Sequence, residues 1–304
     1  MLVAYHLAKR CLPDHLSKFS RKDFTLPQLF ACLVVKEHQN KTYRGIEALL
    51  RDSEHWCKQI GMKRVPDHNT LCRAARTLGC ESHDKRLLDR VARWAVSSKI
   101  LGRTCAIDST LYDTHHRSRH YEQRCRHHAS SCEKTANSRR SRSAKRSPKL
   151  TLSVDTATHL IVAAQARTGM GSDAPDFIPL LRQAKRRWPR LRTVLADAGF
   201  DSHENHRIAR RKLRLRTLIK VGIGRPSAKP LASRYRRSMQ KKLRGSQKGK
   251  PYGRRAQAET VNSMMKRNLG DHLRARTPEG RQFEQMLRVI THNISLLLAD
   301  EIED

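Results

Sequence analysis

Two aspartates stand directly after short apolar segments that have the composition of buried strands. Asp108 follows residues 104–107, and Asp197 follows residues 193–196. Carboxylates at the carboxyl ends of neighbouring strands point into the crevice where open α/β sheets do their chemistry. With a third acid they would hold two divalent metal ions about 4 Å apart, the arrangement used for in-line phosphoryl displacement. An aspartate after a strand is usually a turn residue, so the pair alone does not establish such a site.

The third acid is Glu259, in a segment with helix signals at both ends. Pro251 precedes the segment 252–269 and Gly270 follows it, which predicts one helix. Magnesium prefers carboxylate and water ligands, so Asp108, Asp197 and Glu259 together suit Mg²⁺.

Three further functional side chains share the face of Glu259 in that helix. At 100° per residue, Tyr252, Arg255 and Lys266 fall with Glu259 in a stripe about 60° wide, where a helix that only packs would carry apolar residues. The alternative is that Arg255 and Glu259 form an ordinary i,i+4 salt bridge. That alternative does not explain Tyr252 or Lys266.

Other acids have structural explanations in the sequence. Asp201 begins Asp201-Ser-His-Glu204, which predicts a helix N-cap. Asp155 lies in a predicted hairpin turn, and Asp173 and Asp176 lie at a helix start, where acids favour the helix dipole. Asp113 is an odd number of residues past Asp108, so an extended strand turns it to the opposite face.

The order of periodic segments predicts an α/β fold with a mixed sheet preceded by a small helical domain. The expected elements after residue 100 are strands at 104–107, 150–154, 160–166, 193–196 and 213–221, with helices at 176–187 and 203–212.

The first hundred residues predict short helices. Thr25 and Thr42 are expected to cap two of them, residues 66–69 open a third that stops at Gly79, and a fourth begins near Ser82. Such a set suits either a helix-turn-helix DNA reader or a bundle that supports the next domain. The sequence leaves both open.

The charge points to a polyanionic partner. The chain of 304 residues has 63 Lys+Arg against 28 Asp+Glu, a net charge of +35. Nucleic acid is the expected partner, an anionic membrane surface is the second choice, and no apolar run is long enough to span a bilayer. Segments 117–149 and 222–251 are strongly basic and are expected to be loops that contact phosphates without reading bases. Charge that only aids solubility is the alternative, although solvated surfaces usually mix signs.

The eight cysteines form no Cys-x-x-Cys pair. Most lie in apolar patterns, which favours free thiols in a reducing cytosol, and no signal peptide is expected. Cys125 and Cys132, with several nearby histidines, have ligand types that suit zinc but a spacing that matches no usual zinc site. A basic DNA-contacting loop with cysteines by chance is the alternative.

These motifs resemble a known family. Tyr252-x2-Arg255-x3-Glu259-x6-Lys266 resembles the signature of DDE transposases of bacterial and archaeal insertion sequences. Ile107-Asp108-Ser109-Thr110 and Val194-Leu-Ala-Asp197-Ala-Gly-Phe200 are similar to the family's two aspartate blocks. Pro66-Asp-His-Asn-Thr-Leu71 is similar to a segment near the end of the family's helical N-terminal part, and the resemblance covers most of residues 25–298.

The resemblance implies a helical N-terminal domain, residues 1–100, that binds DNA, and a ribonuclease H-like catalytic domain, residues 101–304. It implies two Mg²⁺ ions on Asp108, Asp197 and Glu259, with Mn²⁺ as a substitute, and contacts from Tyr252, Arg255 and Lys266 to transposon-end DNA. The expected protein is a cytoplasmic, nucleoid-associated transposase that cleaves double-stranded DNA at terminal inverted repeats and transfers the ends, as a homodimer in the DNA complex.

Three other functions are alternatives to transposition. The first is a catalytically silent, transposase-derived DNA-binding regulator, which does not need carboxylates facing a polyanion. The second is a stand-alone structure-specific nuclease, which strand-joining activity would distinguish. The third is an RNA-binding protein, for which 5% aromatic residues provide few stacking platforms.

Overall fold

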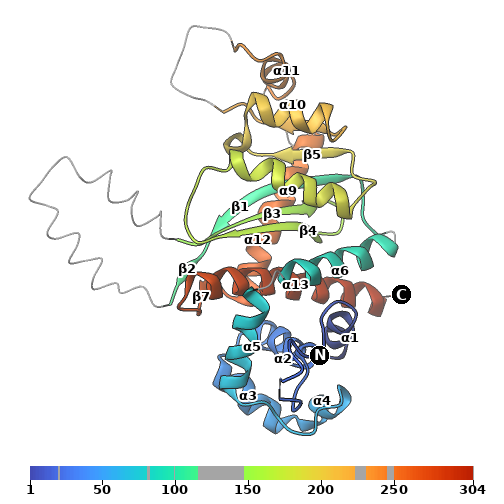
Figure 1. Ribbon diagram of the computed structural model, residues 1–304. Coiled ribbons are helices and arrows are strands. Elements are labelled where there is room, and N and C mark those ends of the chain that lie inside the picture. The colour runs from blue at the N-terminus through green and yellow to red at the C-terminus, as the bar shows by residue number, and fades with distance from the viewer. Residues whose placement is uncertain are drawn as a thin grey trace, which may run out of the picture.

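A five-stranded mixed sheet forms the centre of the protein (Figure 1). The computed structural model describes residues 1–19, 21–80, 83–98, 100–115, 147–222, 231–244 and 250–303. The strand order is β4-β3-β1-β5-β6, with bounds β1 Thr104–Leu111, β3 Lys149–Asp155, β4 Ile161–Arg167, β5 Thr193–Ala196 and β6 Arg216–Ile219. The first three strands pair antiparallel, whereas β5 and β6 run parallel to β1.

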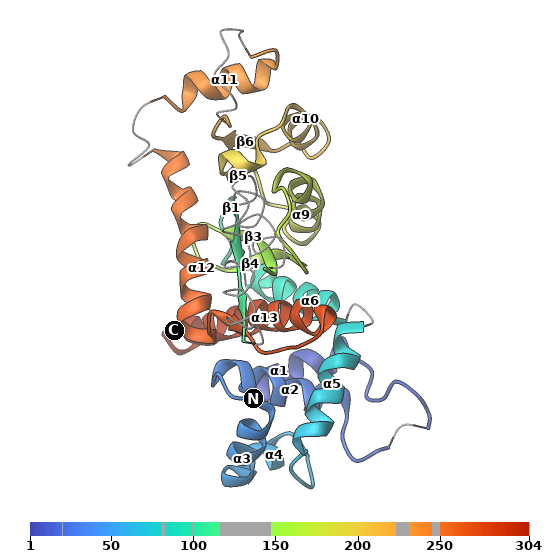
Figure 2. The ribbon, with the colours of Figure 1, turned by 90° about the vertical axis from the view of Figure 1, so that its left-hand side faces the viewer.

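Helices cover both faces of this sheet. On one face lie α9 (Ala174–Arg187) and α10 (His203–Arg211), and on the other lies α12 (Ala256–Leu269), as Figure 2 shows edge-on. A mixed sheet between helices, preceded by helices, is the expected α/β, ribonuclease H-like arrangement. The fold prediction is confirmed.

The first strand is longer than the sequence predicted. β1 does not end before Asp108 but continues to Leu111, because its antiparallel pairing with β3 persists from Cys105 opposite Asp155 to Leu111 opposite Lys149. The last strand, β6, is shorter than the expected 213–221. Asp108 is therefore held within a strand rather than in a turn.

The predicted helix 252–269 is two elements. Pro251–Arg255 forms a 3-10 helix, η3, and the α-helix α12 begins only at Ala256. The expected stripe angle for Tyr252 is wrong for this reason, since a 3-10 helix turns more per residue than an α-helix.

The predicted basic loop 222–251 contains a helix. α11 (Arg234–Lys242) is capped by Ser233 and buries Tyr235 and Met239, an apolar pair at i,i+4 spacing. The expectation that this segment is a loop is wrong for residues 234–242. Most of the other basic segment, 117–149, lies outside the described residues, but Lys149 itself is a buried residue of β3.

The N-terminal helices begin where the capping residues indicated. Thr25 forms a full capping box at the start of α2 (Leu26–His38), and Thr42 caps α3 (Tyr43–Asp52). The third expected helix is α5 (His68–Cys80), which continues through Gly79, and the fourth is α6 (His83–Ser97). The structure adds α1 (Leu2–Lys9) and α4 (Glu54–Gln59).

The C-terminal helix α13 (Pro278–Glu303) joins the two parts of the chain. It packs against α2, α5 and α6 and also against β4. Between α2 and α13, Glu37 lies fully buried among Lys36 and Arg288. A two-residue bridge of β2 (Asp113–Thr114) and β7 (His272–Leu273) lies beside α13. None of the described helices has an apolar stretch that would cross a lipid bilayer.

Candidate active site

The register of two parallel strands places Asp108 and Asp197 side by side. Ile107 in β1 pairs with Ala196, the last residue of β5, and each of the two residues is followed directly by an aspartate. Neighbouring strands lie about 4.8 Å apart, so the two backbones present their carboxylates at adjacent positions on one edge of the sheet. Asp197 is exposed, whereas Asp108 is partly buried.

The surroundings of Asp108 connect it to the helix that carries the third acid. Burial raises the pKa of Asp108, and the negative charge of Glu259 raises it further, while Arg255 opposes the shift. Asn262 in α12 donates from Nδ2 to Oδ2 of Asp108 at 3.0 Å. The face of α12 that holds Glu259 therefore lies against the Asp108 position in β1.

Arg255 pairs with Glu259 and interacts electrostatically with Asp108 and Asp197. Its guanidinium donates to Oε1 of Glu259 at 2.5 Å, so the i,i+4 salt bridge considered from the sequence is present. Burial alone would lower the pKa of Arg255, but the pairing with Glu259 and the charges of Tyr252 and Asp197 raise it. Arg255 is therefore stabilised in its charged form by Asp197 as well as by Glu259. The Glu259 side chain is 54% exposed.

Tyr252 is buried, and its hydroxyl donates to the carbonyl of Ala196 at 3.2 Å. Ala196 is the residue before Asp197, so this bond anchors η3 to the end of β5. Burial raises the pKa of Tyr252, and the charge of Asp197 adds to the shift. The contact therefore places Tyr252 directly behind the residue position of Asp197.

Lys266 lies away from this group. It is seven residues past Glu259, or about 10 Å along the helix. Its ammonium stands 5.5 Å from the ring centroid of Tyr112, which Arg288 also contacts. The structure therefore brings Asp108, Asp197, Glu259, Arg255 and Tyr252 together and leaves Lys266 farther along α12.

Comparison with known proteins identifies the family of this chain. The family described as "Transposase DDE domain" matches residues 100–294, well over half of the chain. This chain belongs to the DDE transposase family. A comparison with curated proteins gives no match. Transposition acts on DNA, and members of the family generally use divalent metal ions.

Asp108, Asp197 and Glu259, called the DDE acids below, are candidate ligands of a divalent metal ion. In the described part of the chain, no three His, Cys, Asp or Glu side chains are grouped so as to hold a metal ion as they stand. Glu259 instead has one oxygen on Arg255. Three carboxylates are nevertheless ligands that suit Mg²⁺. Among the described residues, the buried Oδ1 of Asn262, next to Asp108, has no hydrogen-bond partner. Cys125 and Cys132, considered for zinc, lie outside the described residues.

Asn262 is one functional neighbour that sequence reasoning missed. It is 7% exposed and lies one helical turn after Glu259. The i,i+3 spacing from Glu259 was a readable signal, but the contact with Asp108 joins residues 154 positions apart. No local pattern indicates such a partner.

Asp173 is a second missed residue. It accepts a hydrogen bond of 2.7 Å from Ser109, the neighbour of Asp108, and pairs with the ammonium of Lys149 at 2.6 Å. A side chain at Gly199, in the Asp197 block, would meet Asp173 Oδ2 at 2.7 Å. Asp173 therefore lies between the two aspartate-bearing segments.

One acid differs from its predicted structural role. Asp173 is the N-cap residue of α9 and Asp176 lies in its first turn, as predicted, and both also pair with Lys149. The N-cap of α10 is Ser202 rather than Asp201. Asp201 is instead buried and pairs with Arg236 of α11 at 2.7 Å.

Proposed function

We propose that this DDE family member cleaves the ends of its own insertion sequence and transfers them to target DNA. The observation that carries the proposal is the register of β1 and β5, which makes Asp108 and Asp197 neighbours at one sheet edge beneath the helix of Glu259. Asp108, Asp197 and Glu259 would hold two Mg²⁺ ions, or Mn²⁺ in their place.

The proposed reaction first hydrolyses one phosphodiester bond and then exchanges a second phosphodiester bond for a new one. In cleavage, a water oxygen bonds to phosphorus and the 3′ oxygen leaves as a hydroxyl. In transfer, that 3′-hydroxyl attacks a target phosphate and a target 3′ oxygen leaves. Bound divalent ions supply activation of the nucleophile and neutralisation of charge at phosphorus.

The chain's own residues hold and orient the reactants. Asp108 is fixed by Asn262, and Asp197 by the anchoring of Tyr252 beneath it. Arg255 pairs directly with Glu259, and its planar fork suits a phosphate as well as a carboxylate. Lys266 would contact the DNA backbone farther from the cleaved bond as a point charge.

The proposed partner is double-stranded DNA bearing the terminal inverted repeats, bound by a homodimer. Residues 1–100 would contribute DNA contacts.

The test uses a duplex carrying the inverted repeats that flank the gene, incubated with the full chain. With Mg²⁺ we expect a nick at the repeat end and joining of the free 3′-hydroxyl to a second DNA, and both should stop when EDTA removes the metal. Asp197→Asn should abolish both steps and keep duplex affinity within about threefold, because an amide is a poor metal ligand.

Two results would contradict this assignment. Cleavage without joining favours a stand-alone nuclease. Binding without cleavage, unchanged by Asp197→Asn, favours a regulator.

A further inference from the structure

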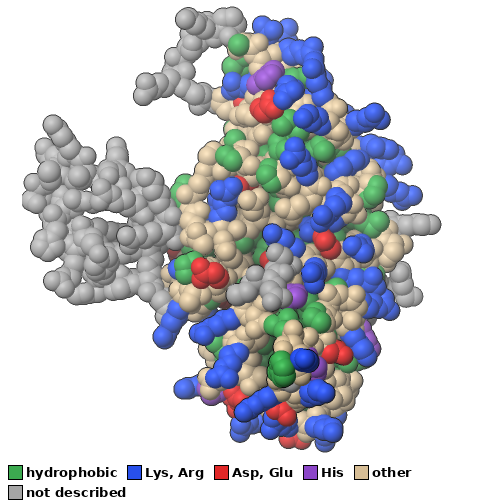
Figure 3. All heavy atoms as spheres, viewed as in Figure 1, with side chains coloured by type: hydrophobic (Ala, Val, Ile, Leu, Met, Phe, Trp, Pro, Cys, Tyr) green, Lys and Arg blue, Asp and Glu red, His purple; other side chains and the backbone are tan. Residues whose placement is uncertain are grey.

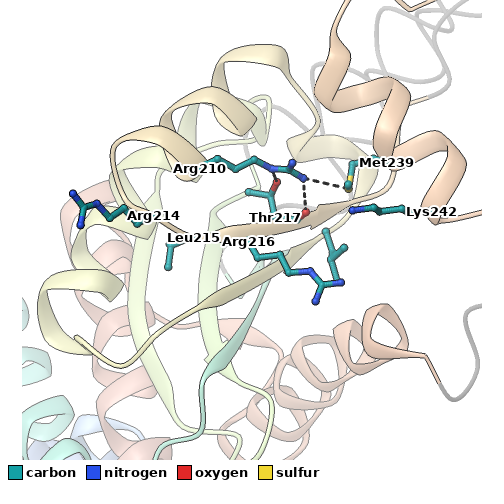
Figure 4. Close-up of a pocket in the computed structure, with 8 residues that line it drawn as sticks. Arg210, Arg214, Leu215, Arg216, Thr217, Met239 and Lys242 are labelled. Carbon is teal, nitrogen blue, oxygen red and sulfur yellow. Dashed lines mark hydrogen bonds between the residues drawn. The ribbon is translucent and has the colours of Figure 1, made fainter.

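A pocket of about 400 Å³ lies at the edge of the sheet, away from the DDE acids. It is formed by β6, the end of α10 and α11, and Figure 4 shows the residues that line it. Four of these residues are cationic, and none is acidic: Arg210, Arg214, Arg216 and Lys242.

The guanidinium of Arg210 is held in place by neutral groups. It donates to the hydroxyl and the carbonyl of Thr217, at 2.7 and 3.1 Å, and lies 5.2 Å from the ring centroid of Tyr235. Burial lowers the pKa of Arg210, and the charge of Arg216 lowers it further. The positive charges of Arg210 and Arg216 repel one another, so a bound anion near both would be stabilised.

Two neighbouring arginines have acidic partners, whereas Arg210 has none among the residues that the structure describes. Arg207, on the same helix, pairs with Glu204, and Arg236 of α11 pairs with Asp201. The pocket is therefore a local excess of positive charge rather than the ordinary surface of this basic protein.

The pocket is open to a ligand from outside. Arg216 and Lys242 are exposed, and β6 is the last strand of the sheet. In Figure 4, Arg210 and Lys242 extend toward one another past Met239, and Arg214 is directed away. Lys and Arg side chains also gather over α10 and α11 in Figure 3. A second pocket, beside α2, is lined by Asp14, Asp23 and Asp67 as well as by arginines, so its charges are of both signs.

The pocket lies at a distance from the DDE acids that a single DNA duplex could span. Arg216 pairs with Thr193, four residues before Asp197 along β5, which is about 13 Å. At 3.4 Å per phosphate of one strand, that distance corresponds to roughly four steps of a duplex.

We propose that this pocket binds backbone phosphates of duplex DNA beside the cleaved end, with Arg210, Arg216 and Lys242 as the phosphate contacts. This inference rests on the proposed function, since it requires that the substrate is duplex DNA. The contacts are sequence-independent, because they go to phosphate oxygens.

The test measures the affinity of the full chain for a random-sequence 30-base-pair duplex at several salt concentrations. Arg216→Gln with Lys242→Gln removes two exposed cations of the pocket. Losing two phosphate contacts should flatten the slope of log K against log salt by about 1.8 and weaken binding about sixtyfold at 0.1 M salt. The matched control is Arg182→Gln with Arg190→Gln, two exposed arginines on and after α9, which lowers net charge equally.

The outcomes separate the two claims. A pocket variant that matches the control in slope and affinity, while the unaltered chain binds duplex DNA, overturns the pocket and leaves the proposed function standing. Failure of the unaltered chain to bind duplex DNA at low salt overturns both. Thermal melting checks that both double variants are folded.

Discussion

Replacing Asn262 with alanine tests whether the candidate site depends on the orientation of Asp108. The change removes the amide that donates to Asp108 at 3.0 Å. A hydrogen bond to a charged group contributes about 1.5–3 kcal/mol, and each 1.36 kcal/mol is tenfold in rate. We therefore expect cleavage to slow by about tenfold to a hundredfold.

The assay is single-turnover cleavage of the terminal-repeat duplex across a Mg²⁺ titration. Removing a group that orients a metal ligand weakens metal binding as well as rate, so the half-saturating Mg²⁺ concentration should rise in Asn262→Ala. Asn268→Ala is the matched control, since Asn268 is the same residue type on the same helix and is exposed. Duplex affinity should stay unchanged in both variants.

Two results would refute this reasoning. One is an Asn262→Ala rate and Mg²⁺ dependence equal to those of Asn268→Ala. The other is loss of cleavage in proportion to loss of folded protein, measured by circular dichroism, which would make Asn262 a packing residue only.

Three further changes test the supporting structure. Gly199→Ala should displace Asp173, which the new Cβ would meet at 2.7 Å, and slow cleavage with duplex affinity retained; cleavage at the unaltered rate would contradict this. Burial lowers the pKa of His292 to about 4, so stability is full above pH 6.5 and falls by up to about 3 kcal/mol toward pH 4. Urea unfolding of His292→Gln should show a weaker pH dependence over that window, and an unchanged one would refute the assignment. Glu37→Gln breaks the buried ion pair with Arg288 and should lower the free energy of unfolding, measured in urea, by about 3–5 kcal/mol. A decrease under 1 kcal/mol would contradict a stabilising role of this pair between α2 and α13.

Local periodicity predicted most of the elements and many of their ends, but not the extension of β1, the start of α12 or the helix α11. The hairpin β3–β4 and the helices α9 and α10 follow from alternating or helical apolar spacing, which is a local property of the chain. β1 extends past Asp108 because a partner strand pairs with it, and no residue after Asp108 indicates that partner. α11 was missed because its high charge hid the i,i+4 pair Tyr235 and Met239.

The same distinction between local signals and tertiary contacts applies to the candidate site. Asp108, Asp197 and Glu259 were readable because strand ends and helix signals are local. The bonds that fix them are tertiary, such as Ser109 to Asp173, 64 residues apart. Tyr252 illustrates the limit, since helical geometry placed it on the stripe of Glu259, whereas the structure buries it beneath Asp197.

The placement of acids in this basic protein argues for an enzyme rather than a DNA-binding derivative. Glu37, Asp176 and Asp201 have side chains at most 4% exposed and are used in ion pairs inside the fold. Asp197 and Glu259 are exposed beside the basic surfaces that would receive DNA. Exposed carboxylates there repel phosphates and weaken binding unless cations neutralise them. Among the described residues, Arg255 forms an ion pair with Glu259 but not with Asp197. A protein that merely bound DNA would gain affinity by losing these acids, whereas metal-dependent phosphoryl transfer requires them.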